Sequence, residues 1–101
     1  MSEEKLSRTV IVGNPQGLHL RPIERFARLA SQFDAQIEVI NDNIRADGKS
    51  ILNILTLGAA QGTCLVLEAV GPDAERALEA LANFVEHDFE MHDASDRQSS
   101  G

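Results

Sequence analysis

Short segments with the apolar period of a strand alternate along this chain with short helical segments. Apolar side chains recur at every second residue on one face of a strand, and at every third or fourth residue on one face of a helix. Four segments are predicted to be strands, and they cover Leu6–Gly13, Ala35–Asn41, Ile44–Ala46 and Gly62–Val70. Three segments are predicted to be helices, from His19 to Gln32 or Phe33, from Ile51 to Leu57, and from Gly71 to about His87.

The resulting order is β-α-β-β-α-β-α, and most of its elements are too short for the crossovers that parallel strands need. An antiparallel sheet with the helices packed on one face buries every apolar stripe. We therefore predict an α+β open-faced sandwich, in which three helices cover one face of a four-stranded antiparallel sheet. The domain is expected to span residues 1–87, and the polar residues 88–101 are expected to form a disordered tail.

The net charge of −7 argues against nucleic acids and anionic membranes as partners, because both would repel the chain. No apolar run approaches the ~20 residues that span a bilayer, and the first residues lack the pattern of a signal peptide. Cys64 is the only cysteine, so an internal disulfide is excluded and a reducing compartment is favoured. We expect Cys64 to be an inert packing residue inside a strand. These features predict a cytoplasmic location.

No metal site and no cofactor are predicted. His87 and His92 lie five residues apart among acidic residues, which is the nearest approach to a ligand cluster in the sequence. A metal site there would need a third ligand and a rigid backbone, and a polar tail does not supply them.

The segment from Gly17 to Pro22 carries the main functional signal. Proline is tolerated in the first helical turn, so Pro22 places the start of the helix at about His19. The imidazole then lies at the amino end of a helix, where unbonded backbone N–H groups and the helix dipole attract anions. Arg21 adds a fixed charge and a fork of donors suited to phosphate oxygens. This combination is typical of a histidine that becomes phosphorylated.

Simpler structural interpretations exist for each of these residues. Taken alone, His19 also fits a loop histidine that caps a helix, and Arg21 also fits an ordinary partner in a surface ion pair. Ser50 is predicted to cap the short helix that follows it. Arg25 and Arg28 lie one turn apart and face outward, so they would complement an acidic partner or form a merely solvated face.

The short helix after Ser50 is apolar nearly all round. Ile51, Leu52 and Leu55 cannot all share its buried side with the other apolar residues, so some of them are expected to be exposed. An exposed apolar patch beside a reactive residue indicates a surface for docking a protein. The alternative is that the tail or a neighbouring molecule covers the patch.

Two motifs give the chain a resemblance to a known family. Gly17-Leu18-His19-Leu20-Arg21-Pro22, followed by Lys49-Ser50-Ile51 and Leu57-Gly58, resembles HPr, the histidine-containing phosphocarrier protein of the sugar phosphotransferase system. The resemblance extends from about Leu6 to Val85 and includes the order of the elements. It implies an HPr-like fold and a bacterial carrier in sugar transport that is itself a substrate of its partners, rather than an enzyme.

The resemblance also implies a role for each matching residue. Enzyme I, charged by phosphoenolpyruvate, would phosphorylate the δ nitrogen of His19, and the carrier would pass the group to a IIA domain of a sugar transporter. Leu20 and Arg21 would supply backbone N–H groups, and Arg21 also its guanidinium. Ser50 matches the regulatory serine that an ATP-dependent HPr kinase/phosphorylase modifies in some bacteria. The docking surface would comprise Leu20, Glu24, Arg25, Arg28, Ile51, Leu52 and Leu55.

Other functions remain consistent with the same residues. A regulatory relative, such as the nitrogen-type branch, would have the phosphorylation state of His19 or Ser50 sensed by a kinase or transcription factor without moving sugar. A plain binding domain would keep the fold and lack phosphotransfer. Glu24 occupies a position of the docking surface where the family has a small or neutral residue. We therefore expect Glu24 to affect which partner proteins bind.

Overall fold

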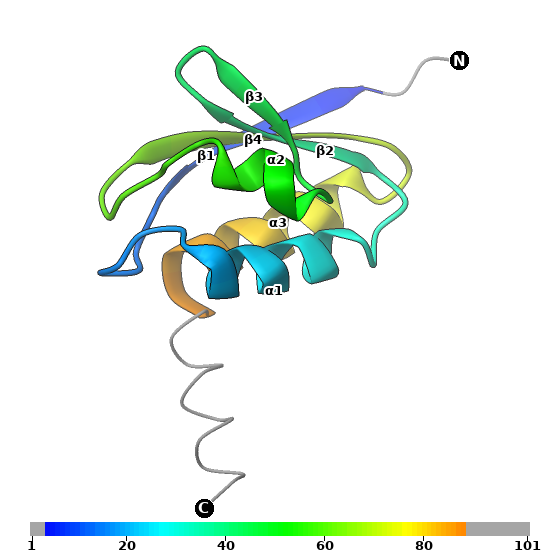
Figure 1. The fold of residues 1–101 in the computed structure, drawn as a ribbon. Helices are drawn as coiled ribbons and strands as arrows, with labels where there is room; N and C mark the ends of the chain where they lie inside the picture. Colours follow the sequence, from blue (N-terminus) through cyan, green and yellow to red (C-terminus); the bar gives the residue numbers. More distant parts are fainter. Residues whose placement is uncertain (1–3, 89–101) are drawn as a thin grey trace, which may run out of the picture.

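The computed structural model describes residues 4–88, which form the predicted open-faced sandwich (Figure 1). The antiparallel sheet has the order β1-β4-β2-β3. Its strands are β1 (Lys5–Ile11), β2 (Gln36–Asn41), β3 (Ile44–Asp47) and β4 (Cys64–Val70). The helices on one face are α1 (Leu20–Ala30), α2 (Ile51–Leu55) and α3 (Ala74–Asn83), and α3 continues into a π-helical turn, η1 (Phe84–Asp88).

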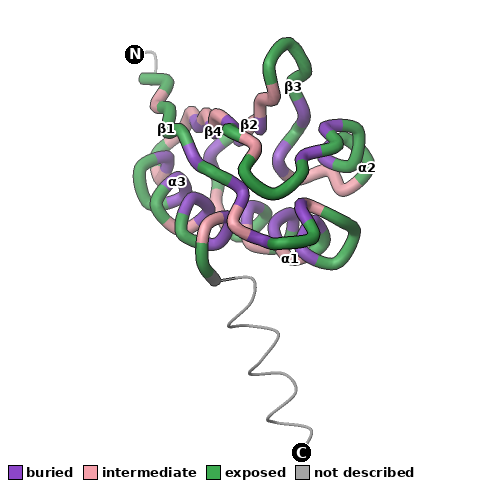
Figure 2. The backbone as a smooth tube through the Cα atoms, turned by 90° about the vertical axis from the view of Figure 1, so that its left-hand side faces the viewer, coloured by how far each residue is buried: buried purple, intermediate pink, exposed green. Residues whose placement is uncertain are grey.

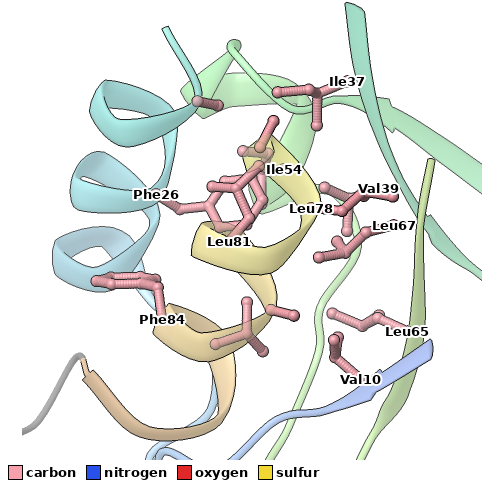
Figure 3. Close-up of a cluster of buried hydrophobic side chains, with 14 of the residues drawn as sticks. Val10, Phe26, Ile37, Val39, Ile54, Leu65, Leu67, Leu78, Leu81 and Phe84 are labelled. Atoms are coloured by element: carbon pink, nitrogen blue, oxygen red, sulfur yellow. The ribbon is translucent and has the colours of Figure 1, made fainter. Parts of the chain in front are cut away.

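The core lies between the sheet and the helices, as Figure 3 shows. Alternate residues of the strands point into it, and Leu65 and Leu67 of β4 are fully buried. Phe26 of α1 and Ile54 of α2 close the core from the helical side. Each fully buried side chain of this size contributes about 1.5–3 kcal/mol. The same alternation places the apolar stripes of all three helices against one face of the sheet.

The opposite face of the sheet is more solvated, as its alternation predicts. Thr9 and Ile11 of β1 are exposed there, and Val66 and Glu68 of β4 are half-buried. The interpretation of Cys64 as a packing residue is wrong, because this residue opens β4 and is exposed. A strand's first residue on an uncovered face has no layer of side chains above it, which explains the difference.

Helices α1 and α2 end earlier than the sequence pattern indicates, whereas the last helical segment, α3 with η1, reaches Asp88, close to the predicted end at about His87. Helix α2 ends at Leu55, and the Thr56 and Leu57 N–H groups then bond three residues back, to the Asn53 and Ile54 carbonyls, at 3.1 and 3.0 Å. Helix α1 ends at Ala30, and α3 gives way to η1 after Asn83. Within the described residues, no helix has the length and apolar character needed to cross a membrane. The predicted tail lies almost entirely outside them, since residues 89–101 are not described.

Asp73 fastens the start of α3 to the connection between α1 and β2. Its two carboxylate oxygens accept hydrogen bonds of 2.9 Å from the backbone N–H groups of Asp34 and Ala35. These bonds, led by that from Asp34, hold the pKa of the Asp73 carboxyl below its usual value. The carboxylate therefore joins two segments that are almost forty residues apart in sequence.

Replacing Asp73 by asparagine is expected to lower the stability of the fold at neutral pH and to weaken its dependence on pH. Because the folded pKa is lowered, the carboxylate's contribution is complete above the ordinary value of 3.8 and is lost as the pH falls through the folded value. Urea unfolding at neutral pH and at about pH 3 measures this effect. Glu79→Gln, on the exposed side of α3, is the control, and equal pH sensitivity in Asp73→Asn and the unchanged chain would contradict the role.

Candidate functional site

The loop that leads from β1 into α1 is shaped by Asn14, which is buried. The Asn14 side-chain oxygen accepts a hydrogen bond of 2.9 Å from the Gln16 N–H, and its carbonyl accepts one of 2.8 Å from the Gly17 N–H. This is an Asx turn, in which a side chain replaces a backbone partner. Asn14 is followed by Pro15, and an Asn-Pro pair is a known signal for turn initiation.

A second loop, which follows α2, holds this turn in place. The Leu18 N–H donates a hydrogen bond of 2.8 Å to the Ala59 carbonyl. Gly17 lies against the same carbonyl with φ +76°, and a Cβ at this position would be only 2.7 Å from the Ala59 oxygen. A residue without a side chain is therefore required at Gly17, both for the backbone conformation and for the close approach.

His19 occupies the N-cap position of α1 and is exposed. Its backbone is extended, with φ −100° and ψ −174°, and its carbonyl accepts the first intrahelical bond, of 3.0 Å, from the Ile23 N–H. The His19 side chain makes no capping hydrogen bond to the helix. The interpretation of His19 as a histidine at a helix cap is confirmed for its position, but its side chain makes no capping bond, and the imidazole lies at the surface beside the helix end.

The amino end of α1 presents backbone donors next to this imidazole. Leu20 and Arg21 precede Ile23, whose N–H makes the first intrahelical bond, so their N–H groups lie in the first turn and point beyond the helix end. Both residues are exposed, while Pro22 is buried and contributes no N–H. The donors, the helix dipole and the Arg21 charge together favour an anion beside His19.

Ser50 caps α2, as the sequence predicts. Its hydroxyl oxygen accepts a hydrogen bond of 3.3 Å from the Asn53 N–H. The preceding residue, Lys49, donates from Nζ to the Phe33 carbonyl at 2.8 Å, which ties the turn before α2 to the segment that follows α1. Ser50 itself is half-buried.

Apolar side chains are exposed on α2 and at the start of α1, two helices that pack against each other. Leu52 is 75% exposed, Leu20 52% and Leu55 40%. Ile51 is half-buried and packs against the core, so it belongs only to the edge of this patch. Figure 2 shows the exposed outer sides of the two helices. The structure thus brings apolar residues from two separate segments onto one surface.

The charged residues of α1 are placed less uniformly than the sequence indicates. Glu24 and Arg28 are exposed, whereas Arg25 is half-buried and its Nη1 atom is inaccessible. The expectation that Arg25 faces fully outward is therefore wrong. A long arginine stem can lie along the surface and bury part of its guanidinium, which a helical spacing argument does not include.

The described residues contain no group of three or more His, Cys, Asp and Glu side chains that could hold a metal ion. The His87 Nε2 atom lies 3.9 Å from the Glu86 Oε1 atom, and His92 falls outside the described residues.

Comparison with known proteins decides which family has this arrangement. Residues 6–87 match the family described as "PTS HPr component phosphorylation site". The chain belongs to the HPr family. HPr proteins are phosphocarriers of the phosphotransferase system rather than catalysts, and they act together with the enzymes of that system. This chain is thus an HPr-type phosphocarrier.

Similar HPr-type proteins belong to more than one branch of the family. The chain is 37% identical over 86 residues to the phosphocarrier protein NPr of Shewanella violacea, covering 85% of this chain and 94% of that one. It is 39% identical over 88 residues to the phosphoryl donor subunit DhaM of the PEP-dependent dihydroxyacetone kinase of Providencia stuartii. That match covers 87% of this chain and only 18% of the DhaM subunit. The crystal structure of HPr-C-His from Thermoanaerobacter tengcongensis is similar to this chain, with a TM-score of 0.80 and 40% identity, covering 84% of this chain and 96% of that one.

Proposed function

We propose that this HPr-type protein accepts a phosphoryl group on His19 from enzyme I and passes it to IIA domains of sugar transporters, in the cytoplasm. The observation that supports this proposal is the exposed imidazole of His19 at the amino end of α1, beside the backbone N–H groups of the first turn. A phosphoryl group on the ring would lie where donors and a positive charge stabilise it.

The transfer needs few groups from the carrier itself. An unprotonated nitrogen of His19, the δ nitrogen in this family, attacks phosphorus, and the N–P bond forms while the bond from phosphorus to the donor breaks. The N–H groups of Leu20 and Arg21 and the Arg21 guanidinium balance the charge on the transferred oxygens. Delivery reverses these events, with His19 as the leaving group. Because such transfer depends mainly on positioning and charge, the partner protein can complete the site.

The partner is proposed to dock on the exposed apolar residues of α1 and α2. Leu20, Leu52 and Leu55 supply apolar contact area next to His19, with Ile51 at the edge. Arg25 and Arg28 favour a partner with acidic residues, and Glu24 selects against an acidic residue directly opposite it. An HPr partner that combines apolar and acidic groups fits this surface best.

A regulatory role is the second candidate, and the comparisons supply a specific reason for it. The chain is as similar to an NPr protein and to a DhaM subunit as it is to HPr proteins, with identities of 37%, 39% and 40%. In this alternative, a kinase or transcription factor senses the phosphorylation state of His19 or Ser50, and the protein takes no part in sugar transport.

A panel of phosphoryl donors and acceptors separates the two candidates. The protein is incubated with phosphoenolpyruvate and either a sugar-type or a nitrogen-type enzyme I, and the labelled carrier is then offered to a sugar IIA domain, a nitrogen IIA domain and a PEP-dependent dihydroxyacetone kinase as acceptors. We expect an acid-labile, alkali-stable phosphate, with fastest delivery to a sugar IIA domain. Preferred delivery to a nitrogen-type acceptor would support the regulatory role instead. Failure of every enzyme I to label the chain would contradict both and favour a plain binding domain.

We also propose Ser50 as the site of an ATP-dependent HPr kinase/phosphorylase. Replacing Ser50 by alanine is expected to abolish ATP-dependent labelling and to lower stability by about 1 kcal/mol, because α2 loses its cap. Ser50→Asp is the matched control, since an aspartate keeps the cap and adds a negative charge that slows docking of an acidic partner. Kinase labelling and urea unfolding measure the two effects, and labelling that persists in Ser50→Ala would contradict the assignment.

A further inference from the structure

The described chain ends beside the loop that carries His19. The Glu86 Oε2 atom accepts a hydrogen bond of 3.0 Å from the Ile11 N–H, and the Val85 carbonyl accepts one of 3.2 Å from the Gly13 N–H. The ring centroid of Phe84 lies 6.4 Å from that of Phe26 in α1. Figure 1 shows η1, in orange, next to the start of α1. Residues that follow η1 therefore leave the fold close to the site.

The last residue of η1 and the residues that follow it are strongly acidic. Residues 88–96, called here the acidic segment, contain Asp88, Glu90, Asp93 and Asp96 and no lysine or arginine. The segment lies beyond the residues that the family shares, since the family match ends at residue 87. Its charge is therefore an addition to the HPr domain and is not needed for the common fold.

Helix α1, whose Phe26 lies against Phe84, carries basic residues. Arg21, Arg25 and Arg28 are spaced four and three residues apart, so they lie along one face of α1, called here the basic face. Arg21 and Arg28 are exposed on this face, and Arg25 is half-buried. Glu24 is the acidic residue within the same helix. The proposed function assigns this face to acidic partner proteins, and the acidic segment carries the same kind of charge as such a partner.

The acidic segment is long enough to reach the whole basic face. The eight residues from 89 to 96 have a fully extended contour length of about 28 Å, whereas an 11-residue helix is about 16 Å long. Attachment at η1 gives the segment an effective concentration in the millimolar range at this face. Such tethering favours a weak electrostatic contact in cis over binding of the same peptide added in trans.

We propose that the acidic segment binds the basic face of α1 in cis and competes there with acidic partner proteins. The competition rests on the proposed function, whereas the contact itself does not. Raised salt weakens the contact, because the charges lie near the surface and are screened. The HPr domain then carries its own competitor, which favours partners with enough apolar contact area to displace it.

Paramagnetic broadening of backbone amide signals tests the contact in the full chain. A nitroxide is attached to Ser95→Cys in a Cys64→Ser background, which leaves a single thiol. We expect the amide signals of Arg21, Arg25 and Arg28 to broaden at low salt and to recover at about 0.5 M salt. Uniform broadening over the surface would overturn the proposal. Broadening of an unlabelled ¹⁵N chain mixed with a labelled ¹⁴N chain would also overturn it, because the contact would then join two molecules.

A charge variant with a matched control tests the competition. Glu90→Gln, Asp93→Asn and Asp96→Asn together are expected to remove the broadening and to raise the rate of phosphotransfer at low salt about two- to fivefold. The control neutralises Glu4, Glu75 and Glu79, which lie together over β1 and α3, and should change neither quantity. Broadening that survives in the first variant, or equal effects of the two variants, would overturn the proposal. Loss of broadening without any phosphotransfer in the unchanged chain would support the contact and contradict only the proposed function.

Discussion

Replacement of His19 by alanine is expected to reduce phosphorylation by enzyme I and phosphoenolpyruvate below detection. The exposed imidazole is the only nucleophile that the first turn of α1 presents beside its backbone donors. Removing it takes away the atom to which the phosphoryl group is bound, so the remaining N–H groups and Arg21 have no covalent intermediate to stabilise. Radiolabelling from phosphoenolpyruvate, followed by stability tests in acid and alkali, measures this loss.

His87→Ala is the matched control for this experiment. His87 is also exposed, but it lies in η1 beside Glu86 rather than at the start of a long helix. We expect His87→Ala to be labelled as fully as the unchanged chain. Unfolding curves for both variants should match that of the unchanged chain, because the His19 side chain makes no capping hydrogen bond. Full labelling of His19→Ala would move the site to another histidine.

Most of the fold follows from the periodicity of the apolar residues. The two periods separate strands from helices, and short elements leave an antiparallel sheet with one covered face as the arrangement that buries every stripe. The location of His19 was equally accessible, because Pro22 marks the first helical turn irrespective of the rest of the chain. Both predictions depend on local rules that operate within a few residues.

The features that the sequence did not reveal depend on contacts between distant segments. The bond from Ile11 to Glu86 joins residues 75 positions apart, and the bonds to Asp73 join residues 38 and 39 positions apart. The partial burial of Arg25 and the exposure of Cys64 likewise depend on which surfaces neighbouring elements cover. Asn14 is an intermediate case, since its turn is local but its burial is not.

Replacing Gly17 by alanine is expected to lower the stability of the fold by about 3 kcal/mol and the rate of phosphotransfer by about 10- to 100-fold. A positive φ costs an alanine roughly 1–2 kcal/mol, and the new Cβ would also be 2.7 Å from the Ala59 carbonyl oxygen. The same oxygen accepts a hydrogen bond from the Leu18 N–H. The loop can therefore relieve the close Cβ contact only by displacing the bond between Leu18 and Ala59, which lies next to His19 in the chain. A displacement of about 1 Å at a reacting group is enough to lower a rate about 100-fold.

The Gly62→Ala variant separates the effect of the close Cβ contact with Ala59 from the effect of a positive φ at an alanine. Gly62 has φ +85°, close to that of Gly17, but a Cβ there would meet nothing within 4 Å. We expect this control to lose about 1 kcal/mol of stability and to keep the full rate of phosphotransfer. Urea unfolding and the rate of labelling by enzyme I, measured on both variants, separate the two effects. If both variants lost equal stability and kept the full rate, the contact with Ala59 would have no part in positioning His19, because backbone strain alone would then explain the need for glycine.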